Sequence, residues 1–160
     1  MKQKSFEPDT FAANVLAGSP AAVGVPKERL PAATMQAITV ETNPSAPAFA
    51  VEAGGAYGLR WYTPGGEVDL CGHATMGTAF VIAPQYDTKL DPTVFHTKKA
   101  GHTLIVSKQG DLMQLEFPAY EYKDVTVTPD MEEARGIRVL EASPGRALPS
   151  GVENEEPVLT

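Results

Sequence analysis

Residues 67–80 of the chain read EVDLCGHATMGTAF, and the expected fold is built around this stretch. It follows the turn sequence Pro64-Gly65-Gly66 and continues into an almost entirely apolar run, HATMGTAFVIA, at 73–83. A helix that is apolar on all sides is a buried helix. The sequence therefore predicts a buried helix over 73–83 that Pro84 ends, since proline disrupts a helix interior.

The residues that open this helix have the chemistry of a binding site. The first backbone N–H groups of a helix have no partner inside the helix and carry partial positive charge, so they attract a carboxylate or phosphate. Gly72 would let a ligand approach the backbone closely. His73 is suited to proton transfer near neutral pH, and a thiol such as Cys71 at a helix start can have a lowered pKa. The alternative is a packed cysteine and a capping histidine without chemistry.

The rest of the chain predicts an α+β fold with many short strands. Fourteen Gly and fourteen Pro divide it into short pieces, which favours strands joined by turns. Gly54-Gly55 suits a tight hairpin between two of them. Strands are expected at 4–7, 21–25, 47–53, 57–63, 93–97, 102–108 and 111–117, and further helices at 30–43 and 128–136.

Composition excludes several classes of function. The net charge of −7 disfavours nucleic acid and anionic lipid as partners, because both require Lys and Arg for neutralisation. With one cysteine, no intramolecular disulfide can form, and no stretch approaches the roughly 20 apolar residues of a membrane span. A cytoplasmic location is therefore expected. His96 and His102 lack metal-ligand spacing, so no metal is expected.

Four segments match, in order and in spacing, the segments of a known family: AGSPAAV (17–23), LPAATMQAITVETNPSAPAF (30–49), LRWYTPGGEVDLCGHATMGTAFVI (59–82) and LEFPA (115–119). With them the sequence resembles the PhzF family, which is named for a phenazine-biosynthesis isomerase and is related to diaminopimelate epimerase and proline racemase. The resemblance implies a diaminopimelate-epimerase-like lobe, in which a mixed, barrel-like sheet wraps one central buried helix. It also implies two such lobes facing each other across the active site.

The resemblance further implies proton transfer beside an acid group without a cofactor. His73 and Cys71 are then the expected catalytic residues, and Ser19, Ser45, Gly72 and Ala74 the expected substrate-binding residues. Two positions depart from the family pattern. Ser19 replaces the asparagine of the family's GNPAAV, and Ala46 replaces the general acid/base glutamate of its SETAF. Alanine cannot carry a proton, and neither Glu41 nor Glu52 is an obvious substitute.

The segment after Ala119 is too short to build a second lobe. We expect residues 1–142 to form a single lobe and 143–160, rich in Pro, Gly and Glu, to form a flexible tail. A homodimer could place two copies of the lobe face to face and complete the cleft. Three functions stay open: an isomerase or epimerase of a small carboxylic acid, a non-catalytic module that binds such acids, and a truncated inactive remnant.

Overall fold

The computed structural model describes residues 4–14, 16–42, 46–119, 125–136, 138–142 and 150–151. Contacts within the chain divide it into two compact units, Met1–Pro118 and Ala119–Thr160. The predicted division at residue 142 stays a prediction. Of the predicted tail, only Ser150 and Gly151 lie within the described residues.

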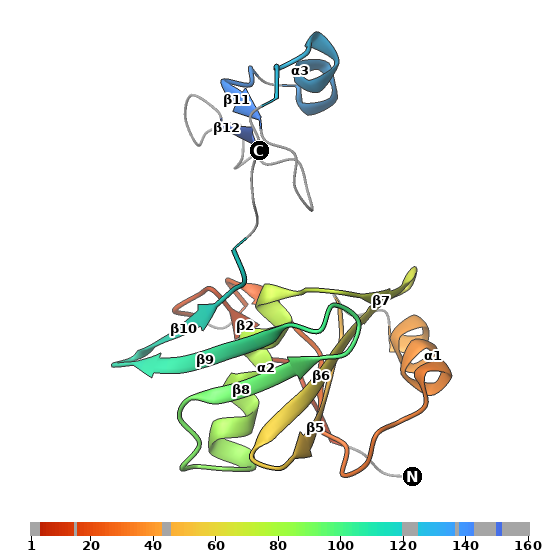
Figure 1. Ribbon diagram of the computed structural model, residues 1–160, viewed down its shortest axis with the longest axis vertical. Helices are drawn as coiled ribbons and strands as arrows, with labels where there is room; N and C mark the ends of the chain where they lie inside the picture. The colour runs from red at the N-terminus through yellow and green to blue at the C-terminus, as the bar shows by residue number, and fades with distance from the viewer. Residues whose placement is uncertain are drawn as a thin grey trace. The chain divides into compact units, whose positions relative to one another are not determined.

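The first unit is an α+β domain built on a mixed sheet (Figure 1). The strand order is β1-β4-β5-β6-β8-β9-β10, with β7 paired to β6. The pairs β4–β5 and β6–β8 are parallel and the others antiparallel, while β2 and β3 form a separate two-stranded sheet. The elements are β1 Ser5–Phe6, β2 Asp9–Thr10, β3 Ser19–Pro20, β4 Val23–Gly24, α1 Ala32–Thr42, β5 Ala48–Ala53, β6 Ala56–Thr63, β7 Gly66–Val68, α2 Gly72–Gln85, β8 Thr93–Thr97, β9 Thr103–Gln109 and β10 Leu112–Glu116.

Most of the elements expected from the sequence are confirmed. Helix α1 lies within the predicted 30–43, and β5 and β6 form an antiparallel hairpin that turns at Gly54 and Gly55. Both glycines have positive φ, at 67° and 87°, a conformation that glycine adopts without steric cost. The strands β8, β9 and β10 also match their predicted positions.

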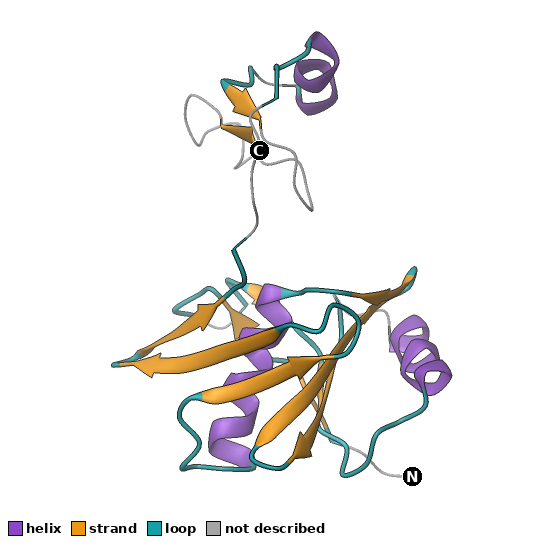
Figure 2. Cartoon of the chain, viewed as in Figure 1, coloured by secondary structure: helices purple, strands orange, loops and turns teal. Residues whose placement is uncertain are grey.

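Helix α2 packs against strands of both sheets and contacts β2, β3, β4, β5 and β10 (Figure 2). Its packed face is made of small side chains such as Ala74, Gly77 and Ala79. Small residues let a helix approach a sheet closely, and here a Cβ atom added to Gly77 would lie 2.9 Å from Cγ of Pro8. Thr78 is also buried on this face, and its hydroxyl donates to the carbonyl of Ala74 at 2.6 Å, which satisfies a buried polar group.

Two details of the predicted helix were wrong. Phe80 is 59% exposed, so α2 is buried along one side and open along the other. The helix also continues through Pro84 to Gln85. Proline lacks an N–H but has the φ value of a helix, so it can stand in a terminal turn where little of the helix follows.

The core lies between α2 and the sheet. Trp61, Leu59, Phe95, Leu104 and Ile82 are its large, fully buried side chains. Within the described residues the strand order ends at β1 and β10, which do not pair with each other. The sheet is therefore open, and no closed barrel is formed by this part of the chain.

The second unit is small. It contains helix α3 (Pro129–Arg135), within the predicted 128–136, and the short antiparallel pair β11 (Glu141–Ala142) and β12 (Ser150–Gly151). Gly136 ends α3 in the left-handed conformation with a φ of 67°, the usual role of glycine after a helix. In the described part of both units, no helix is long and apolar enough to cross a membrane.

Candidate functional site

The amino end of α2 brings together the two side chains with proton-transfer chemistry. Cys71 is the N-cap residue, in an extended conformation with φ −149° and ψ 106°, and its side chain makes no capping hydrogen bond. Instead its Sγ lies 3.5 Å from Nδ1 of His73. The predicted placement of Cys71 and His73 at a helix start is present in the structure, whereas their catalytic role stays a prediction.

The other ring nitrogen of His73 is buried without a partner. Within the described residues, Nε2 of His73 has no hydrogen-bond partner although it is shielded from solvent. An unpaired buried polar atom costs free energy, on the order of 1–3 kcal/mol. Within the described residues, His73 therefore contacts Cys71 through Nδ1 and leaves Nε2 unpaired.

Phe117 lies over the helix start. A Cβ atom at Gly72 would lie 2.8 Å from Cζ of Phe117, closer than real Cβ contacts. A larger residue at position 72 would therefore have to displace the Phe117 ring. Sequence reasoning missed this contact, because the two residues are far apart along the chain and only the fold joins them.

Arg60 and Glu67 form an ion pair across the β6–β7 hairpin that leads into Cys71. Arg60 Nε donates to Glu67 Oε1 at 2.7 Å and Nη2 to Oε2 at 2.5 Å. The Arg60 guanidinium also lies over the ring of Tyr62, 5.3 Å from its centroid. The hydrogen bond from Arg60 is the main cause that lowers the pKa of Glu67, and burial is the main cause that raises the pKa of Tyr62. The pair joins β6 to β7, the strand that precedes the site.

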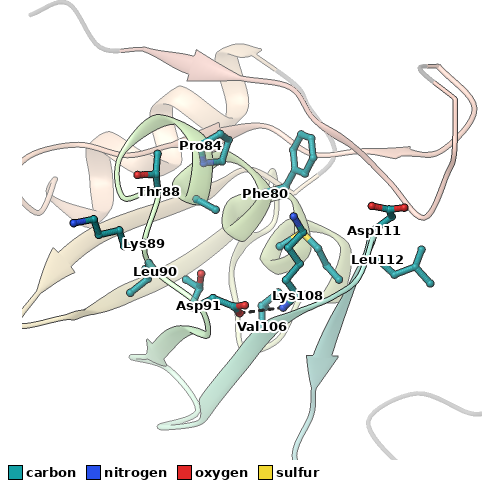
Figure 3. Close-up of a pocket in the computed structure, with 13 residues that line it drawn as sticks. Phe80, Pro84, Thr88, Lys89, Leu90, Asp91, Val106, Lys108, Asp111 and Leu112 are labelled. Carbon is teal, nitrogen blue, oxygen red and sulfur yellow. Dashed lines mark hydrogen bonds between the residues drawn. The ribbon is translucent and has the colours of Figure 1, made fainter.

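A cavity of about 570 Å³ lies along the open side of α2, toward its carboxyl end (Figure 3). Phe80 and Pro84 of α2 form one wall and Val106 of β9 and Leu112 of β10 form another. Neither Cys71, Gly72 nor His73 lines this cavity. A hollow at the amino end of α2, which the sequence predicted, stays a prediction.

No metal centre is formed by the described residues, since they contain no group of three His, Cys, Asp or Glu side chains placed to hold an ion. His96 Nδ1 lies 3.2 Å from the hydroxyl of Thr103, its neighbour across β8 and β9.

The sequence of residues 8–152 matches the family of phenazine biosynthesis-like proteins, PhzC-PhzF. The chain belongs to this family. It is 40% identical over 142 residues to an uncharacterized isomerase of Pseudomonas aeruginosa, and that match covers 88% of the chain and 54% of the relative. A second uncharacterized isomerase of the same organism is 34% identical over 137 residues, covering 86% of the chain and 52% of the relative. The chain thus spans about half the length of these curated relatives.

Solved structures of the family have the same fold. A PhzF-family protein of Enterococcus faecalis superposes with a TM-score of 0.87 at 40% identity, covering 99% of this chain and 60% of that one. A PhzC/PhzF protein of Clostridium difficile gives 0.82 at 32% identity, again with 99% and 60% covered. The expected epimerase-like lobe with a mixed sheet is confirmed at this level.

The remaining residues that the PhzF resemblance assigned are only partly described. Ser19 lies in β3, next to α2, where its carbonyl accepts a hydrogen bond from the Thr10 hydroxyl at 2.9 Å. Ser45 lies outside the described residues. Ala74 is fully buried, backbone included, so in this structure it is not open to a ligand. Ala46, at the position of the family glutamate, has a φ of 42°, and Glu52 accepts a hydrogen bond from Gly55 N at 3.0 Å in the β5–β6 turn.

Proposed function

We propose that the chain is part of a PhzF-type isomerase or epimerase that moves a proton on a small carboxylic acid without a cofactor. The observation that carries the proposal is the 3.5 Å contact between Cys71 Sγ and His73 Nδ1 at the start of α2. A thiol beside an imidazole at a helix start has the base, the proton store and the anion-binding N–H groups that such a reaction needs.

In this mechanism the substrate carboxylate accepts hydrogen bonds from the backbone N–H groups of Gly72 and His73. These groups have no acceptor inside the helix. His73 Nδ1 takes the thiol proton of Cys71, and the thiolate then removes the proton from the carbon beside the carboxylate. Negative charge that develops on the acid is stabilised by the same N–H groups, which are already oriented and require no reorganisation. Return of a proton to another carbon, or to the other face of the same one, completes the isomerisation.

Return to the opposite face needs a second donor, and this unit contains a single thiol. We propose that a second lobe supplies the other side of the cleft. When this chain is prepared alone, the second lobe is a second copy of the chain in a homodimer. A C2 arrangement would bring Cys71 and His73 of both copies toward one cleft. We also propose that the sheet wraps α2 as a central helix.

The test is deuterium exchange at the carbon beside the carboxylate, followed by NMR for a panel of small acids. We expect exchange with the wild-type chain and a loss of about 100-fold or more in Cys71→Ser and His73→Ala, as for the removal of a general acid or base. Thr103→Ala, which removes the hydroxyl near His96, is the matched control and should keep full exchange. Unchanged exchange in both site variants would contradict the proposal.

The second candidate is a module that binds small carboxylic acids without turnover. It is supported by Ala46, which has no acidic group at the position of the family glutamate. Calorimetry with the same acids separates the two functions. Binding without deuterium exchange supports the module, and restoration of exchange by Ala46→Glu would tie the missing activity to that position.

A further inference from the structure

Strand β7 (Gly66–Val68) leads from the sheet to the start of α2 (Figure 1). It is three residues long, and among the described strands it pairs with β6 alone. Only Asp69 and Leu70 lie between its last residue and Cys71, the N-cap of α2. A connection of two residues has a short reach and can absorb little movement. A shift of β7 would therefore carry Cys71 with it.

The backbone carbonyl of Glu67, in the middle of β7, faces away from β6. In an antiparallel pair, a carbonyl that bonds across the ladder accepts from the N–H of the residue directly opposite. Tyr62 lies opposite Glu67, but its N–H donates to the carbonyl of Pro47 at 3.1 Å, on the β5 side of β6. The Glu67 carbonyl is thus left on the outer edge of β7, where no described strand pairs.

Lys99 supplies a donor on this outer edge. Its Nζ donates to the Glu67 carbonyl at 2.5 Å, from the turn between β8 and β9. Hydrogen bonds between Thr97 and His102, each of 2.9 Å, close this turn at its base. A hydrogen bond from an ammonium group is stronger than one between neutral groups. Glu67 is therefore held twice, with its carboxylate on Arg60 and its carbonyl on Lys99.

The neighbouring Lys98 acts on Glu67 in a different way. The hydrogen bond from Arg60 is the main cause that lowers the pKa of Glu67, and the charge of Lys98 adds to it. Lys98 thus acts on the carboxylate through its charge, whereas Lys99 binds the backbone of β7. Both lysines are exposed and stand in the same turn. The pair therefore allows the effect of a nearby charge to be separated from that of a bond to the strand.

We propose that Lys99 is a positioning residue for the candidate site. By binding the Glu67 carbonyl it fixes β7, and through β7 it holds Sγ of Cys71 beside Nδ1 of His73. A thiol beside an imidazole at a helix start reacts faster than an ordinary thiol, because more of it is present as thiolate. Loss of the Lys99 bond lets β7 move and lowers the reactivity of Cys71. A consequence for turnover rests on the proposed function, whereas the effect on the thiol does not.

Alkylation by iodoacetamide tests the proposal, since Cys71 is the single cysteine of the chain and is half-buried. We expect Lys99→Met to slow alkylation of the whole chain at pH 7 by about threefold or more. Lys99→Arg, which keeps a charged donor of similar reach, should restore the rate to within about twofold of wild type. Lys98→Met removes a charge from the same turn without touching the β7 backbone, so it is the matched control and should leave the rate unchanged.

The His73→Ala background distinguishes a positioning role from a general loosening of the fold. If Lys99 acts through the contact between Cys71 and His73, Lys99→Met should slow alkylation no further in this background, because substitutions that act on one contact are not additive. An unchanged or faster rate in Lys99→Met, an equal slowing by Lys98→Met, or the same slowing with and without His73 would overturn the proposal. Urea unfolding of each variant verifies that folded chains are compared.

Deuterium exchange on small acids connects the positioning role to turnover. Because Lys99 acts through the strand and not on the acid, Lys99→Met should lower kcat by about threefold or more and keep KM within about twofold. A raised KM with unchanged kcat would contradict the proposal. A wild-type chain that exchanges no acid would refute the proposed function but leave the alkylation result intact, since alkylation requires no substrate. Failure of the one is thus distinguished from failure of the other.

Discussion

Arg60 of β6 and Glu67 of β7 form a two-bond ion pair diagonally across the hairpin, in which Glu67 lies opposite Tyr62, and their side chains are 10% and 21% exposed. The carboxylate also lies 3.5 Å from the hydroxyl of Tyr62. Because β7 runs directly toward Cys71, this pair links the stability of the sheet to the position of the candidate site. The link can be tested by pH, since the pair requires an ionised carboxylate.

Glu67→Gln should lower the free energy of unfolding by about 1–2 kcal/mol at pH 7, the range of a hydrogen bond to a partly exposed charged group. Arg60 holds the pKa of Glu67 below its ordinary value of 4.5. A group with a lowered folded pKa stabilises the fold above its unfolded pKa, and this contribution is lost as pH falls through the folded pKa. Urea unfolding should therefore show the difference between wild type and variant at pH 7 and a shrinking difference below about pH 4.

The control for this experiment is Glu116→Gln. Glu116 is an exposed carboxylate at the end of β10, and its replacement should change stability by no more than about 0.5 kcal/mol at either pH. A constant difference between Glu67→Gln and wild type from pH 7 to pH 3 would mean that the charge of Glu67 does not contribute.

Gly77→Ala should destabilise the protein even though alanine favours helices. Alanine would gain up to about 1 kcal/mol in helix propensity. Its Cβ, however, would lie 2.9 Å from Cγ of Pro8 and 3.3 Å from Cβ of Ala21. Neither neighbour has a flexible end that can move aside, and overpacking of this kind costs about 1–3 kcal/mol. The cost exceeds the gain over most of this range, and we expect a net loss of about 1 kcal/mol in urea unfolding.

Gly65→Ala is the matched control, because its nearest neighbour, Thr63 Oγ1, would lie at an ordinary 3.7 Å. Equal stability of Gly77→Ala and Gly65→Ala would show that α2 is packed less closely against β2 and β3 than the structure indicates.

The sequence predicted helices and strands well where they are long enough to have a pattern. The apolar run at 73–83 indicated α2, and Gly54-Gly55 indicated the β5–β6 hairpin. The strands β2, β3 and β7 were not predicted, since they have two or three residues and none lies in an apolar run like the one at 21–25 that indicated β4. An apolar run also cannot reveal that one side of the helix is open, because Phe80 looks the same in sequence whether buried or exposed.

The candidate site was predictable only where its residues are close together in the sequence. Cys71 and His73 are two residues apart, so a local prediction of a helix start sufficed to place them together. Phe117 meets Gly72 only because β10 contacts α2, and Arg60 meets Glu67 only through the register of a hairpin. These contacts depend on strand pairing, and no local pattern in the sequence encodes it.

Ile82→Ala should be among the most destabilising single substitutions in the first unit. Ile82 is fully buried in the core between α2 and the sheet. Truncation of such a side chain removes buried apolar contacts and leaves a cavity, which costs about 2–5 kcal/mol. Val40→Ala on the exposed face of α1 should stay within about 0.5 kcal/mol in the same urea unfolding experiment. A small effect of Ile82→Ala would place the core elsewhere than under α2.

Because Phe117 contacts Gly72, we expect Gly72→Ala to affect the stability of the fold and the binding of a small acid differently. Gly72→Ala pushes its Cβ against the ring, but Cζ is the far end of a side chain that is 49% exposed and can swing outward. The loss in stability should therefore stay below about 1 kcal/mol, and Phe117→Ala in the same chain should remove it.

Binding of a small carboxylic acid at the start of α2 should instead be weakened by about tenfold in Gly72→Ala, and adding Phe117→Ala should not restore it. The reason is that the acid needs the space over the Gly72 backbone itself. Calorimetry and urea unfolding of the two single variants and the double variant measure both quantities. Recovery of acid binding in the double variant would show that the ring, and not the helix start, limits the ligand.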